Sequence, residues 1–142
     1  SLIHMKERIR GYTEAMQDQG LQKNIIIKEI RHKHIDTDSQ DVMKSLTGRG
    51  DQKKVEAVLF ATNALSIKGM YYIIKNHIRV PDQLDVIGFD GNAAFDFFDP
   101  PLTHIQQPIE EMAKESVRIL LEQINGTKKI SQIILQPELV VR

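Results

Sequence analysis

The stretch Val86-Ile87-Gly88-Phe89-Asp90-Gly91 decides the fold, because an apolar run ends there in a carboxylate that is followed by glycine. Together with the breaker Val80-Pro81 upstream, this run predicts a strand from Leu84 to Phe89. In open α/β sheets, ligands bind outside the carboxyl ends of the strands. We therefore expect Asp90 to lie at a ligand-binding edge.

Two other short β-type runs also end in polar residues. The run Val55–Phe60 is followed by Asn63, and the extended piece around Ile105 is followed by Gln107. Because parallel strands end at the same edge of a sheet, we expect both amide side chains to lie near Asp90. The three strand ends together predict one polyol-binding edge.

Helical and β-type patterns alternate along the chain, and this order predicts an α/β fold with a parallel sheet and helices on both faces. The expected helices are 4–18, a short helix capped by Asp38 or Ser39 and ending at Leu46, a helix after Asn63, and 108–125. The expected strands are Ile25–Ile27 with Ile30, Val55–Phe60, Leu84–Phe89, a short piece at Ile105, Ile130–Leu135 and Glu138–Val141.

Composition excludes several classes of function. The chain has 142 residues with 19 basic and 19 acidic side chains, so it lacks the basic bias of a nucleic-acid-binding domain. It has no cysteine, which excludes disulfides and thiolate metal sites. No apolar run is long enough to span a bilayer. No catalytic constellation stands out, so we expect no enzyme activity, no metal and no cofactor.

Each candidate ligand contact also has a structural interpretation. Asp90 is typical of a turn after a strand, and both Asn63 and Gln107 are possible helix N-caps. Arg8 is, from spacing alone, a solvated helix arginine. The aromatic cluster of Phe95, Phe97 and Phe98 beside Asp90 is favoured as core or interface rather than as a sugar-stacking surface.

Five segments in order resemble the effector-binding core of LacI/GalR-type transcription regulators and, more distantly, the periplasmic sugar-binding proteins. They are Arg8–Tyr12, Ala61–Asn63 with Gly69, Val80-Pro81 through Asp90, Pro101–Thr103 with Gln107-Pro108, and Leu135–Arg142. The resemblance implies one lobe, with crossover elements, of a periplasmic-binding-protein-like (type I) fold.

The resemblance also implies a domain organisation. Residues 1–102 correspond to an incomplete C-terminal lobe, residues 103–126 to a crossover and a helix that packs on an absent N-terminal lobe, and residues 127–142 to returning strands. We expect the chain to be a fragment. The helix 108–125 carries an apolar stripe, and we expect this stripe to need an apolar partner.

The function implied by the resemblance is that of a cytoplasmic, homodimeric regulator. A small sugar effector would contact Arg8, Asn63, Asp90 and Gln107, and operator DNA would be bound by a helix-turn-helix outside this chain. There is no membrane partner in this interpretation. The alternative is a periplasmic sugar-binding protein of a transport system. Gly91 favours that alternative, because many regulators have Asp or Asn there, whereas the segment Gln106–Pro108 favours the regulator.

Overall fold

The computed structural model describes residues 2–48, 55–91, 93–127 and 130–142. Its α-helices are α1 (Ile3–Asp18), α2 (Ile35–Thr47), α3 (Asn63–Lys75) and α4 (Ile109–Ile124). Its strands are β1 (Ala57–Leu59), β2 (Asp85–Phe89), β3 (His104–Gln106) and β4 (Glu138–Val140). Short 3-10 helices cover Gln22–Asn24, His32–His34 and Ala93–Phe97.

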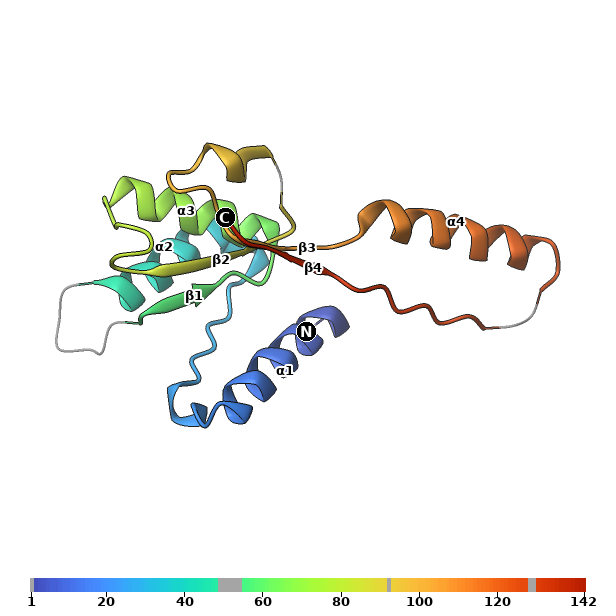
Figure 1. The fold of residues 1–142 in the computed structure, drawn as a ribbon, viewed down its shortest axis with the longest axis horizontal. Helices are drawn as coiled ribbons and strands as arrows, with labels where there is room; N and C mark the ends of the chain where they lie inside the picture. The colour runs from blue at the N-terminus through green and yellow to red at the C-terminus, as the bar shows by residue number, and fades with distance from the viewer. Residues whose placement is uncertain (1, 49–54, 92, 128–129) are drawn as a thin grey trace.

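The strands form a mixed, mostly parallel sheet in the order β1-β2-β3-β4 (Figure 1). Strand β2 pairs in parallel with β1, where Val86 faces Val58, and with β3, where Phe89 faces Ile105. The last strand, β4, runs antiparallel to β3. This arrangement confirms the predicted α/β class, and it places β2 between its two parallel neighbours, β1 and β3.

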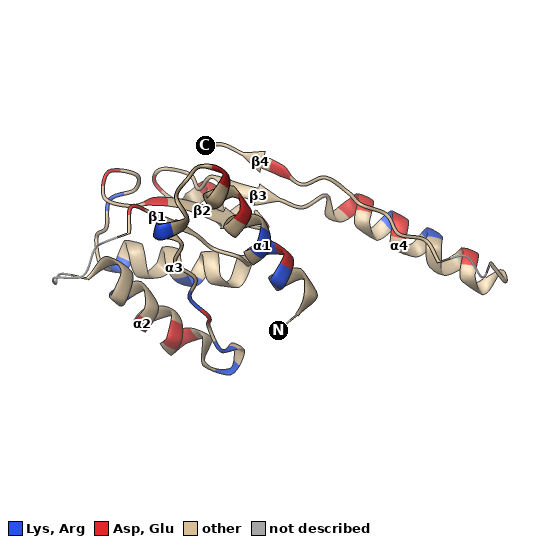
Figure 2. Cartoon of the chain, turned by 90° about the horizontal axis from the view of Figure 1, so that it is seen from below, with Lys and Arg blue, Asp and Glu red and all other residues tan. Residues whose placement is uncertain are grey.

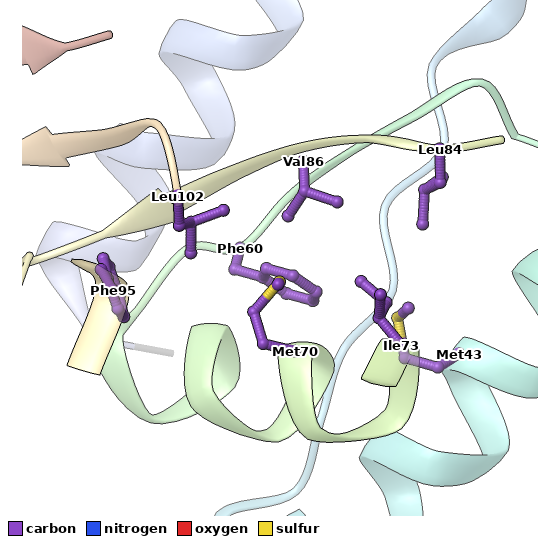
Figure 3. Close-up of a cluster of buried hydrophobic side chains, with 8 residues drawn as sticks. All are labelled: Met43, Phe60, Met70, Ile73, Leu84, Val86, Phe95 and Leu102. Atoms are coloured by element: carbon purple, nitrogen blue, oxygen red, sulfur yellow. The ribbon is translucent and has the colours of Figure 1, made fainter. Parts of the chain in front are cut away.

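The core lies between the sheet and α3, and α2 packs against α3 and contributes Met43 to the core (Figure 3). Its buried members are Met43, Phe60, Met70, Ile73, Leu84, Val86, Phe95 and Leu102. Contact between helix and sheet is close, because a Cβ atom on Gly69 would lie 1.9 Å from Cζ of Phe60. Glycine therefore allows the Phe60 ring to rest directly on the backbone of α3.

The four predicted α-helices are confirmed, and among them α2 alone differs from its expected bounds by more than one residue. Helix α2 begins at Ile35, earlier than expected, and neither of its predicted caps closes its N-terminus. Asp38 lies in the first turn and binds Arg31, while Ser39 is buried inside the helix. The sequence did not predict the short 3-10 helices, among them Ala93–Phe97 in the segment that follows Gly91.

Two predicted strands are wrong. The run Ile25–Ile27 has no strand assignment, and Ile26 and Ile27 remain 48% and 44% exposed rather than buried. The run Ile130–Leu135 is also not a strand. Both have suitable composition, but a strand needs a hydrogen-bonded neighbour, and neither run pairs with another described segment.

Helix α4 projects from the body of the molecule with residues 130–137 returning beside it (Figures 1 and 2). We call α4 together with residues 130–137 the arm. No side chain of α4 is buried, and no other described helix or strand packs against it. Its exposed apolar residues are Ile109, Met112, Val117, Leu120, Leu121 and Ile124. Within the described residues, the apolar stripe thus lacks the partner that its pattern calls for.

The described helices include none with the length and apolar character needed to cross a membrane.

We expect two phenylalanines of the same 3-10 helix to differ sharply in their contribution to stability. Phe95 is 1% exposed in the core and Phe97 is 85% exposed. Phe95→Ala should lower the free energy of unfolding by about 3–5 kcal/mol, because it leaves a cavity. Phe97→Ala should change it by less than about 0.5 kcal/mol. Urea denaturation measures both, and Phe95→Leu gives a milder variant if Phe95→Ala does not fold. Equal effects of the two alanine variants would contradict this core assignment.

Asp38 should titrate well below an ordinary aspartate. Hydrogen bonds of 2.8 Å from Nε and Nη2 of Arg31 lower the pKa of Asp38 to about 2, against a partial desolvation that raises it. Because the pKa is lowered in the folded state, the pair stabilises the fold above the usual value of 3.8. That stabilisation is lost as the pH falls toward 2. In NMR titrations, Arg31→Ala should return the midpoint toward 3.8, whereas Arg10→Ala, which removes ion pairs within α1 only, should leave it unchanged. An Asp38 midpoint near 3.8 in the unmodified protein would contradict the assignment.

Candidate functional site

Three of the residues that the sequence nominated as ligand contacts lie around the fourth, Asp90. The amide of Asn63, at the start of α3, donates from Nδ2 to the backbone oxygen of Asp90 over 2.6 Å. The amide of Gln107, just after β3, donates from Nε2 to Oδ1 of the Asp90 carboxylate. The backbone N–H of Asp90 donates to the carbonyl of Ile105 over 2.9 Å. The ends of β2, β3 and the start of α3 are therefore joined through one residue.

Asp90 has a left-handed backbone, with φ of 55°. Residues other than glycine rarely adopt this backbone conformation, although Asp tolerates it better than most. The end of β2, which leads into Asp90, is bound to α3, because the N–H of Phe89 donates to Oγ of the buried Ser66 over 3.0 Å. The left-handed turn follows directly on the last residue of β2, Phe89.

Arg8 reaches the same place from α1. Its Nη1 donates to the carbonyl of Ala61 over 2.6 Å, and its Cζ lies 3.7 Å above the centroid of the Phe89 ring. Desolvation lowers the pKa of Arg8, and the charge of Asp90 raises it. The guanidinium stays charged at any physiological pH, because arginine does not deprotonate in proteins.

The structural interpretations of the two amides as helix caps are wrong. Thr62, not Asn63, caps α3, since its Oγ1 accepts from the N–H of Leu65 over 3.2 Å. Helix α4 follows Pro108 without a side-chain cap, so Gln107 does not serve that role. Both amides are turned to Asp90 instead.

Two residues near the site were not found from the sequence. Ser66 holds the end of β2, as described above, and His104 on β3 is buried beside Gly91. An open hollow of about 180 Å³ lies beside His104 and is lined by Gly91, Asp96, His104, Gln106 and Arg142. The ion pair between Arg142 Nη2 and Asp96 Oδ1, 2.9 Å long, is part of its wall. The only indication of a close neighbour at this place in the sequence was Gly91, the glycine that follows Asp90.

The chemistry of the site is that of hydrogen bonding. It places a carboxylate, two primary amides and a guanidinium around one strand end, and these groups offer both donors and acceptors. In the part of the chain that the structure describes, no group of three or more His, Cys, Asp or Glu residues is placed to hold a metal ion.

Residues 2–142 match the protein family described as the periplasmic binding protein-like domain. Among similar curated proteins is the HTH-type transcriptional regulator MalR of Streptomyces coelicolor, 32% identical over 144 residues. Another is the HTH-type transcriptional regulator DegA of Bacillus subtilis, 32% identical over 140 residues. The alignments cover 99% and 96% of this chain but only 41% and 40% of those proteins. The chain thus spans about two fifths of the length of these relatives.

Solved structures show the same fold. A LacI transcriptional regulator from a Rhodococcus species superposes with a TM-score of 0.78 at 23% identity, over 95% of this chain and 48% of that one. The complex of the transcriptional regulator CelR with cellobiose superposes with a TM-score of 0.75 at 26% identity, over 96% of this chain and 41% of that one.

We expect the contacts of Arg8 to hold α1 against the strand ends. The one described helix or strand that α1 packs against is the 3-10 helix Gln22–Asn24, which follows it in the chain. Spin labels at Gln17→Cys and Lys75→Cys can be placed without competing sites, since the chain has no cysteine. We expect Arg8→Ala to broaden the distance distribution measured between the labels.

Arg10→Ala is the matched control, because among the described residues Arg10 forms ion pairs with Glu7 and Glu14 of its own helix and with no other element. It should leave the distribution unchanged. A distribution that is equally narrow in the Arg8→Ala protein would show that α1 is held by something else.

Proposed function

The chain belongs to the periplasmic binding protein-like domain family, and from that premise we propose that it is the ligand-sensing core of a LacI-type transcription regulator. The ligand is a small sugar or a related polyol. It binds at the carboxyl ends of β2 and β3 and contacts Arg8, Asn63, Asp90 and Gln107.

The observation that carries this proposal is the convergence of these four side chains on one strand end. A sugar hydroxyl donates one hydrogen bond and accepts others, so it suits a site that holds both kinds of partner. The Asp90 carboxylate accepts, and bonds to a charged group are the stronger ones. The planar guanidinium of Arg8 presents donors in a fork that fits two neighbouring oxygens. The amides of Asn63 and Gln107 supply donors and acceptors at the flanks.

The comparisons support both parts of the proposal. The relatives reported above are named as transcription regulators, and this favours sensing over transport. The regulator CelR, which shares the fold, holds cellobiose in its solved structure. A sugar is therefore the first ligand class to test for this chain.

Regulation follows from a shift between conformations. Ligand contacts that are better in one arrangement of the domain change the population of that arrangement, and the change is passed to a DNA-binding helix-turn-helix elsewhere in the protein. In such linked systems the coupling is typically about 1–3 kcal/mol, or about 5–150-fold in affinity. We place the protein in the cytoplasm as a homodimer, where its operator DNA is accessible. It has no catalytic role in this proposal.

Asp90→Asn should weaken sugar binding by about 1.5–3 kcal/mol, the value of a hydrogen bond to a charged group. The ligand is first found by a thermal-shift screen of the full-length protein against cellobiose, other sugars and sugar phosphates. Calorimetry with the best of these then gives the affinity of each variant. Asp85→Asn is the matched control, because Asp85 is exposed at the opposite end of the same strand. It should bind as the unmodified protein does.

Two results would count against the proposal. An affinity that is unchanged by Asp90→Asn would remove this carboxylate from the ligand contacts. A protein that binds DNA of its own promoter but responds to no sugar or sugar phosphate in the screen would exclude the proposed ligand class.

A further inference from the structure

His104 is held rigidly behind the candidate site. Its side chain is buried, with 6% of the residue exposed. Its Nδ1 lies 2.9 Å from the carbonyl oxygen of Leu102, and because a carbonyl only accepts, Nδ1 carries the hydrogen. The ring also meets Phe95 edge-on, with centroids 5.3 Å apart and planes at 75°. Leu102 and Phe95 are themselves core residues, so the imidazole has little freedom to move.

The free edge of this imidazole faces the backbone of Gly91. A Cβ atom on Gly91 would lie 2.0 Å from Nε2 and 2.4 Å from Cδ2 of His104. It would also lie 2.8 Å from Oε1 of Gln106, at the end of a flexible side chain that can turn away. The φ angle of Gly91 lies outside the left-handed region, so its own backbone conformation does not require glycine. The requirement comes from the neighbouring ring.

We propose that His104 is a positioning residue for Asp90, acting through Gly91. The imidazole occupies the space of the side chain that Gly91 lacks, and the backbone of Gly91 rests against it. Asp90 is the preceding residue and has the left-handed backbone, so support at Gly91 limits how far this turn can relax. The carboxylate is thereby kept at the strand end, where Gln107 donates to it, and the backbone oxygen of Asp90 is kept within reach of Asn63. The consequence for ligand affinity rests on the function proposed above.

The proposal makes Gly91 and His104 a matched pair. Gly91→Ala alone forces the added methyl group into a ring that cannot move, and His104→Ala alone removes the support. The double variant, Gly91→Ala with His104→Ala, lacks the imidazole ring and so has room for the methyl group at position 91. That methyl group in turn replaces some of the volume lost with the ring. Gly11→Ala is the control for adding a methyl group, because no described atom beyond its chain neighbours and the backbone of its own helix lies within 4 Å of a Cβ atom at that position.

The first measurement needs no ligand. In NMR spectra of the full-length protein, the backbone amide of Asp90 and the side-chain amide of Gln107 report the turn and its hydrogen bond. We expect both signals to shift in Gly91→Ala and in His104→Ala, and to move back toward their original positions in the double variant. Gly11→Ala should leave both in place. If Gly91→Ala does not fold, recovery of a folded protein in the double variant supports the pairing. A double variant that remains unfolded while His104→Ala folds overturns it.

The second measurement is the affinity for cellobiose, or for whichever sugar gives the largest thermal shift, at a temperature where every variant is folded. We expect Gly91→Ala to weaken binding about tenfold or more, comparable to the loss of one hydrogen bond to a charged group, and the double variant to recover most of it. Unchanged NMR signals and affinity in both single variants overturn the proposal. If no sugar binds the unmodified protein, the proposed function fails, but the NMR comparison still decides the role of His104.

Discussion

The structure depends on the hydrogen bonds that converge on Asp90. They join β2 to β3 through Ile105, to α3 through Asn63 and to the start of the arm through Gln107. A left-handed residue costs about 1–2 kcal/mol, whereas each ordinary hydrogen bond contributes about 0.5–1.5 kcal/mol. One such bond would not maintain this turn, but several together do. The same bonds that stabilise the strand end also gather the polar groups of the candidate site.

Local signals in the sequence were sufficient for the centre of the fold and insufficient at its margins. The strand at Val86–Phe89 could be predicted because an apolar run, a preceding proline and a following Asp-Gly pair all agree. The runs at Ile25–Ile27 and Ile130–Leu135 have equally good strand composition, but pairing is a non-local property that composition does not contain. Similarly, Thr62 and Asn63 are both good helix caps, and only the backbone conformation selects the first.

The candidate site could be nominated residue by residue, but the contacts within it could not. Strand ends and the family resemblance brought Arg8, Asn63, Asp90 and Gln107 into one list. That the two amides would turn to Asp90 rather than cap helices depends on distances across the sheet. His104 was missed for the same reason, because its proximity to Gly91 joins a residue of β3 to one 13 positions earlier, just beyond the end of β2.

The arm is attached to the body through β3 and β4, which lie side by side as an antiparallel ribbon. A second link closes this ribbon, where the N–H of Arg142 donates to Oγ1 of Thr103 over 3.0 Å. Sliding one strand past the other would break these bonds, whereas bending the ribbon across its plane would keep them. Bending is therefore the softer deformation of this connection, and sliding is the stiffer one. Gln107 lies between β3 and α4, so its hydrogen bond to Asp90 ties the connection to the end of β2.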